Sequence, residues 1–208
     1  FRANTARPAL MLDVNECWTR KQAVRHLGEI ESQIDLTWIE EPVRRWDAEG
    51  HAVVGRAVRA AVATGENLTG LDQFGPLFDA RAMDIVQTGS VWGVTHFNRV
   101  AIAAHAHNLP ISPVGYNANP VAHAAAAAPN SLGVEVQDFH FPVGLKVDQQ
   151  IGDGGIILGD APGLGIEVDE AAIAANRLNG AWEVIEGPHV RPERAGLDLG
   201  PPIRASHP

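Results

Sequence analysis

Three acidic residues stand at the ends of three successive apolar segments: Asp13 in LMLDVN, Glu40 in TWIEEP and Glu66 in VATGEN. They are 27 and 26 residues apart, about the length of a strand, a helix and their loops. A parallel barrel gathers the C-terminal ends of its strands on one face. Mg2+ prefers hard oxygen ligands such as carboxylates. The spacing therefore predicts that Asp13, Glu40 and Glu66 together bind Mg2+.

Each acid also has a simpler interpretation, as a solvated strand-end residue or a helix cap. Glu41, next to Glu40, is the residue most easily confused with a ligand. Neighbouring side chains of a strand point in opposite directions, so we expect only one of the two to face a common pocket.

Short apolar runs alternate with stretches of helical spacing, which is typical of a parallel sheet with crossover helices. The predicted strands are 9–14, 37–40, 62–66, 84–88, 111–115 and 133–137. The predicted helices are 19–34, 49–63, 74–82, 95–108 and 119–127, with Asn108 as a helix stop. The fold class is therefore α/β, a (β/α)8 TIM-type barrel. About six of its βα units are present, so we expect the first strands to lie outside this chain.

The pattern changes after residue 137. Segments 143–148, 154–159 and 165–168 are predicted to be short strands joined by Gly/Pro turns, and 169–178 a helix with Asp169 as its N-cap. We therefore predict a partial barrel catalytic domain over residues 1–138. A C-terminal closing segment with an irregular tail is predicted over 139–208.

Composition limits the partners and the compartment. The chain has 208 residues, 20% of them charged, and a net charge of −9, which disfavours nucleic acid or an anionic membrane surface as a partner. No apolar run reaches the roughly 18 residues of a membrane span. Cys17 is the only cysteine, so no intrachain disulfide forms and a reducing, cytoplasmic location is expected.

The segments LMLDVN, TWIEEP and TGEN, in this order and spacing, resemble the enolase superfamily, in its mandelate racemase and muconate lactonizing branch. The resemblance runs from about Leu10 to Glu170 and includes LGDAPGLGIEVDE. It implies that the three matching acids bind Mg2+. The metal then holds the substrate carboxylate and stabilises the enediolate formed when the α-proton is removed. Loss of so weakly acidic a proton needs strong electrostatic stabilisation.

The resemblance also implies a role for Glu135, in GVEVQD, where the branch commonly carries a glutamic acid that hydrogen-bonds the substrate carboxylate. Asn15 lies two residues after Asp13, and Asn67 lies one residue after Glu66. Both asparagines are therefore candidates for substrate contacts. Ordinary loop hydrogen bonding is an equally good interpretation of both asparagines.

The chain departs from the branch at its general base. Gly89 stands where the mandelate racemase type has an aspartate, and Val114 or Gly115 where it has a histidine. A lysine base on the second barrel strand would lie outside this chain. Two residues are weak substitutes: Tyr116, with an ordinary pKa near 10, and His96, which packing at the start of a helix explains at least as well.

We therefore expect a Mg2+-dependent lyase or isomerase that removes the proton α to a carboxylate. Dehydration of a sugar acid is the first choice because it needs one base. A racemase, an epimerase, a cycloisomerase, or a non-catalytic homologue that keeps the metal site remain alternatives. The expected partners are a small carboxylate substrate and further copies of the chain in a homo-oligomer. Trp92, just beyond a strand end, either walls the pocket or packs in the core.

Overall fold

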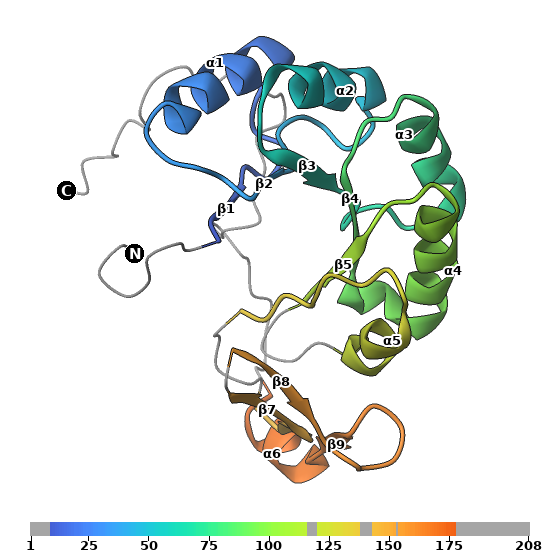
Figure 1. The fold of residues 1–208 in the computed structure, drawn as a ribbon. Helices are drawn as coiled ribbons and strands as arrows, with labels where there is room; N and C mark the ends of the chain where they lie inside the picture. Colours follow the sequence, from blue (N-terminus) through green and yellow to red (C-terminus); the bar gives the residue numbers. More distant parts are fainter. Residues whose placement is uncertain (1–8, 116–119, 138–142, 153, 178–208) are drawn as a thin grey trace, which may run out of the picture. The chain divides into compact units, whose positions relative to one another are not determined.

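The computed structural model describes residues 9–115, 120–137, 143–152 and 154–177. These residues form two compact units. The first unit comprises described residues 9–65 and 72–85, and the second unit comprises 66–71 and the described residues from 86 onward. Figure 1 labels the elements of both.

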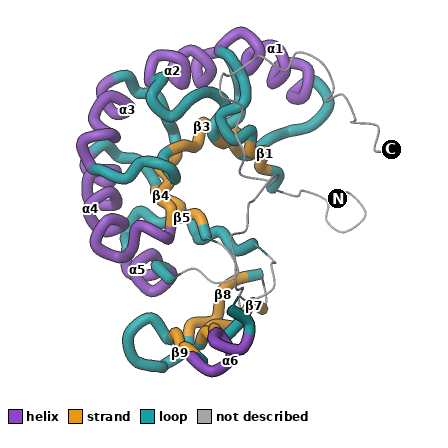
Figure 2. Tube along the Cα trace, turned by 180° about the vertical axis from the view of Figure 1, so that it is seen from behind, coloured by secondary structure: helices purple, strands orange, loops and turns teal. Residues whose placement is uncertain are grey.

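The first unit is built from parallel strands that alternate with helices. Its elements are β1 (Met11–Asp13), α1 (Arg20–Glu31), β2 (Trp38–Glu40), α2 (Ala48–Ala57), β3 (Ala61–Thr64) and α3 (Gly75–Asp79), with the 3-10 helix η1 (Leu71–Phe74, from Asp72) before α3. β2 pairs in parallel with both β1 and β3. Within this unit, α1 and α2 lie along one face of the strands (Figure 2). The predicted α/β fold class is confirmed.

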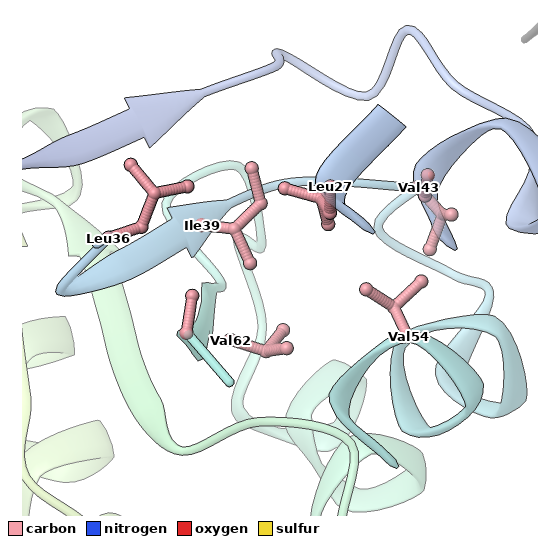
Figure 3. Packing of buried hydrophobic residues seen from close by; sticks show 8 residues of the cluster. Leu27, Leu36, Ile39, Val43, Val54 and Val62 are labelled. Atoms are coloured by element: carbon pink, nitrogen blue, oxygen red, sulfur yellow. The ribbon is translucent and has the colours of Figure 1, made fainter. Parts of the chain in front are cut away.

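The core of the first unit fills the space between the strands and these helices. Leu27 of α1 and Val54 of α2 are fully buried against Ile39 and Val62, which are register partners on β2 and β3 (Figure 3). Burial of each such side chain contributes roughly 1.5–3 kcal/mol. Because side chains alternate along a strand, Ile39 in the core requires Glu40 to point to the opposite face, away from the helices.

α1 begins with a capping box, a feature that was not predicted. The Thr19 side chain accepts from the Gln22 backbone N–H, and the Gln22 side chain caps the Thr19 backbone in return. α2 ends at Ala57, well short of the predicted 63, so that prediction was wrong. The Glu31 carboxylate accepts the N–H groups of Arg59 and Ala60, which turns the chain into β3. This contact spans 28 residues and is invisible to local periodicity.

The second unit continues the same alternation. It contains β4 (Ile85–Gly89, from Val86), the 3-10 turn η2 (Ser90–Trp92), α4 (Gly93–Ala106), β5 (Ile111–Val114) and α5 (Ala122–Ala127), and β4 pairs with β5 in parallel. Asn108 has φ of 58° just after α4, which confirms it as the helix stop. Helices 74–82 and 119–127 were predicted too long, since α3 and α5 are shorter and residue 119 lies outside the described residues.

The predicted sixth strand at 133–137 was wrong. Ile111 donates to Asn130 and accepts from Leu132, but Ser131 forms only an isolated bridge. The Pro113 carbonyl accepts a hydrogen bond from the Glu135 N–H. Proline has no backbone N–H to donate to this segment, so one hydrogen bond of a regular parallel ladder is missing. A regular ladder would put residue 134 opposite that carbonyl, so the segment carries one extra residue, like a bulge.

The remaining described residues form small antiparallel pairs. They are β6 (Leu145–Val147) with β9 (Ile166–Val168), and β7 (Gln149–Gly152) with β8 (Gly155–Leu158), followed by α6 (Glu170–Ala175). Strands were predicted at β6, β8 and β9, but β7 was missed. Asp169 accepts the Ala172 N–H at 2.9 Å, which confirms the predicted N-cap. No helix among the described residues combines the length and hydropathy needed to cross a bilayer.

Candidate metal centre

Asp13 and Glu40 occupy equivalent places on adjacent strands of the first unit. Each is the last residue of its strand, and the two are register partners in the β1–β2 pair. Their side chains therefore leave the same face of the strand pair, the face opposite Ile39. Asp13 is exposed and Glu40 half-buried, so water or a metal ion can reach both.

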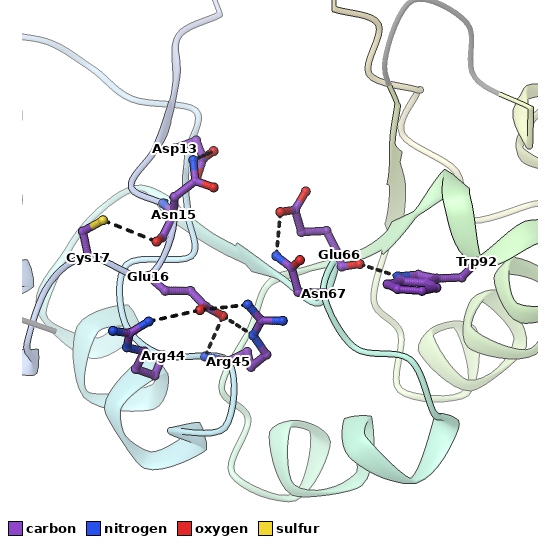
Figure 4. A network of polar contacts seen from close by, with 9 residues as sticks. All are labelled: Asp13, Asn15, Glu16, Cys17, Arg44, Arg45, Glu66, Asn67 and Trp92. Carbon is purple, nitrogen blue, oxygen red and sulfur yellow. Dashed lines mark hydrogen bonds and ion pairs between the residues drawn. The ribbon is translucent and has the colours of Figure 1, made fainter. Parts of the chain in front are cut away.

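The Asp13 carboxylate is held by the residue two positions later. The Asn15 backbone N–H donates to Asp13 Oδ1 at 2.8 Å, and the Asn15 side-chain amide donates to Oδ2 (Figure 4). Asn15 has φ of 50°, a left-handed conformation that asparagine tolerates better than most residues. In this structure, then, Asn15 orients Asp13, as the loop interpretation of this residue predicts.

Glu16, which the sequence did not single out, is fully buried in the same turn. Its Oε1 accepts from the backbone N–H of Arg45 at 3.1 Å, and its Oε2 accepts from Arg45 Nη2 at 3.0 Å. Arg44 Nη1 lies 3.6 Å from Oε2 (Figure 4). These ion pairs join the turn after β1 to the turn after β2. In the sequence, Arg44 and Arg45 look like an ordinary solvated pair of charges.

Glu40 and Glu41 have different environments. Glu41 is fully buried and has φ of 41°. Its N–H donates to Ala63 and its carbonyl accepts the N–H of Glu16 at 2.9 Å, so its backbone ties together the ends of three strands. The side chain that remains partly accessible is that of Glu40.

Glu66 begins the second unit, two residues after β3. Its Oε1 accepts from the Asn67 amide at 2.7 Å, so Asn67 orients Glu66 much as Asn15 orients Asp13. Its backbone carbonyl accepts from the Gly89 N–H at 3.1 Å and from Trp92 Nε1 at 2.8 Å (Figure 4).

His96 lies near the start of α4 and is partly buried. Burial lowers the pKa of His96, and a hydrogen bond with the backbone of Leu68 opposes that shift. The imidazole is therefore neutral near pH 7. Its contact with Leu68 agrees with the packing interpretation of this residue.

Glu135 lies beside the end of β5. Its Oε2 accepts the Gly115 N–H at 3.2 Å and its Oε1 accepts from the Gln137 amide at 3.2 Å. The carboxylate thus stands at the C-terminal end of a parallel strand, where a substrate-contacting acid is expected. Tyr116 lies outside the described residues.

The donor chemistry fits Mg2+, because Asp13, Glu40 and Glu66 all offer carboxylate oxygens. In the described part of the chain, no three His, Cys, Asp or Glu side chains are already grouped as a metal site. Asp13 and Glu40 belong to the first unit and Glu66 to the second, so the convergence of all three stays a prediction.

Comparison with known proteins identifies the family of this chain. The family model described as "Enolase C-terminal domain-like" matches residues 2–172. The L-talarate/galactarate dehydratase of Salmonella typhimurium is 32% identical over 165 residues, covering 78% of this chain and 41% of that enzyme. The 3,6-anhydro-alpha-L-galactonate cycloisomerase of Streptomyces coelicolor is 31% identical, covering 77% of this chain and 44% of that protein. The chain therefore spans less than half the length of these relatives.

Solved structures show the same likeness. An enolase from Bradyrhizobium, complexed with magnesium and mandelic acid, superposes with a TM-score of 0.73 at 32% identity. The match covers 86% of this chain and 49% of that one.

Proposed function

Because this chain belongs to the enolase superfamily, in its mandelate racemase and muconate lactonizing branch, we propose that it carries the metal-binding strands of a Mg2+-dependent enzyme. The reaction is removal of the proton α to a carboxylate of a small acid, and dehydration of a sugar acid is the preferred form. One observation carries the proposal: Asp13 and Glu40 are paired at the ends of adjacent parallel strands, and Glu66 follows the next strand in order.

In this proposal Asp13, Glu40 and Glu66 hold the metal ion. When bound, Mg2+ supplies positive charge that stabilises the negative charge developing on the substrate carboxylate. Asn15 and Asn67 orient the carboxylates of Asp13 and Glu66 through the hydrogen bonds described above. In the same proposal, Glu135 contacts the substrate carboxylate, and its position beside the end of β5 supports this role.

Proton removal needs a base, and the described residues offer a poor choice. His96 is neutral near pH 7 but is engaged with Leu68 at the start of α4. We therefore propose that the base is a residue other than His96, and that dehydration is the simplest reaction because it needs only one base. The preference for dehydration agrees with the named activity of the Salmonella relative, and the cycloisomerase alternative agrees with the named activity of the Streptomyces relative.

The metal site is tested by unfolding the protein with and without Mg2+. Mg2+ at about a hundred times its dissociation constant stabilises a specific site by about 2.7 kcal/mol. Glu40→Gln is expected to abolish that gain, whereas Glu29→Gln, the same change on the exposed face of α1, keeps it. An unchanged melting temperature in Mg2+ would refute the site.

Turnover is tested by incubating the protein and Mg2+ with a panel of sugar acids in D2O. Deuterium exchange at the α-carbon reports proton removal, and 2-keto-3-deoxy acids report dehydration. Exchange without dehydration favours an epimerase or racemase. Metal binding with no exchange for any acid favours the non-catalytic homologue.

A further inference from the structure

The end of β4 supports Glu66 through its backbone. The carbonyl oxygen of Glu66 accepts two hydrogen bonds, one from the Gly89 N–H and one from the indole Nε1 of Trp92. Gly65, just before Glu66, has φ of 125°, so the chain leaves β3 in a conformation that only glycine adopts readily. These two hydrogen bonds to one carbonyl oxygen fix the backbone of Glu66 at the end of the turn.

Gly89 is glycine for lack of space, not for its backbone conformation. Its φ of −67° and ψ of 129° suit any residue. A Cβ at this position, however, would lie 2.8 Å from the Glu66 carbonyl oxygen and 2.9 Å from Trp92 Nε1, closer than real Cβ atoms approach. The close approach of Trp92 to Glu66 therefore excludes every side chain from position 89.

Trp92 occupies the place that a side chain at position 89 would need. Trp92 is 42% exposed, although a tryptophan serving only the core would be buried. The only side-chain donor of Trp92, its indole N–H, donates to the Glu66 carbonyl. Trp92 is the last residue of η2, which places its backbone just after β4. The end of β4 thus presents an indole anchored to a carboxylate-bearing residue and leaves no room for an acid or base at position 89.

We propose that Trp92 is a positioning residue for the metal ligand Glu66, and that Gly89 is small in order to admit it. The inference rests on the proposed function, since it gives Glu66 its metal-binding role. It deepens that function, because in this protein the end of β4 stabilises the metal site and supplies no proton-transfer group.

The test measures Mg2+ affinity by titration calorimetry. Trp92→Phe keeps an aromatic ring but removes the N–H donor, and is expected to weaken Mg2+ binding about three- to tenfold. Gly89→Ala is expected to weaken it at least as much, by pushing the Glu66 carbonyl away. Trp46→Phe, on an exposed ring of the first unit, is the matched control and should keep the parent affinity.

A purely structural role would give a different result. It would lower the urea midpoint of Trp92→Phe in metal-free buffer but leave the Mg2+ dissociation constant of the folded protein unchanged. Unchanged affinity in both Trp92→Phe and Gly89→Ala, with the parent binding Mg2+, overturns this inference alone. A parent that binds no Mg2+ overturns the proposed function and the inference together. If Trp92→Phe does not fold, Gly89→Ala decides by the same criteria.

Discussion

Substitution of Glu16 by glutamine should destabilise the protein strongly, although the residue lies in a short turn. The Glu16 side chain is 1% exposed, while those of Arg44 and Arg45 are 15% and 24% exposed. Removing one member of a buried ion pair typically costs about 3–5 kcal/mol, because the remaining charge is left without a partner. Since both arginines partly reach water, which offsets part of that cost, we expect about 2–3 kcal/mol.

The expected loss is large enough to measure by urea or thermal unfolding. For a chain of this length it corresponds to a melting temperature lower by about 5–10 °C. Glu29→Gln, which makes the same chemical change at an exposed site, should stay within about 0.5 kcal/mol of the parent. In a double-mutant cycle, Glu16→Gln with Arg45→Met should cost less than the sum of the single changes, because the two removed groups are paired.

A free energy of unfolding for Glu16→Gln within about 0.5 kcal/mol of the parent's, or additive effects of the two substitutions, would rule out a stabilising buried ion pair at Glu16. Glu16→Gln should also weaken Mg2+ binding, because Glu16 anchors the turn that carries Asn15 and thus the orientation of Asp13.

Acid should destabilise the protein through His51, which is fully buried, bonded through Nδ1 to the Asp47 carbonyl, and kept at a lowered pKa by burial. Below its ordinary pKa the unfolded chain takes up a proton that the folded chain refuses, so stability should fall between about pH 7 and 5.5. His51→Asn should reduce that fall and the exposed His123→Asn should not, as urea midpoints at each pH would show. Gly144→Ala should cost about 1–2 kcal/mol from its φ of 82°, and more because the new Cβ would meet Ile173. Gly163→Ala has a similar φ of 70° and no described atom within 4 Å, so an equal loss in both variants would contradict the packing argument.

The features that the sequence predicted well are those set by local pattern. Asp13, Glu40 and Glu66 mark strand ends because strand and helix lengths are regular, and the strands that precede them were placed to within a few residues. The Asp169 N-cap and the Asn108 helix stop are equally local, since each depends on one side chain or one backbone conformation.

The features that were missed depend on contacts far apart in the chain. Glu16 and Arg45 are 29 residues apart, and nothing in their local pattern distinguishes them from surface charges. The premature end of α2 depends on Glu31 in the same way. The sixth strand is different, because Pro113 is visible in the sequence and its missing N–H already argued against a complete ladder on that side of β5.

The two turns that follow β1 and β2 contain three non-glycine residues with positive φ: Asn15, Glu16 and Glu41. Each costs of order 1–3 kcal/mol and persists only when the surroundings over-determine it. Here the Glu16–Arg45 ion pair and the backbone hydrogen bond between Glu16 and Glu41 stabilise these conformations. Both contacts lie in the turns that directly follow Asp13 and Glu40. By contrast, Asn108 adopts its positive φ at an ordinary helix end. The strained residues and the buried charges therefore serve the same purpose, because both fix the positions from which the proposed metal ligands leave their strands.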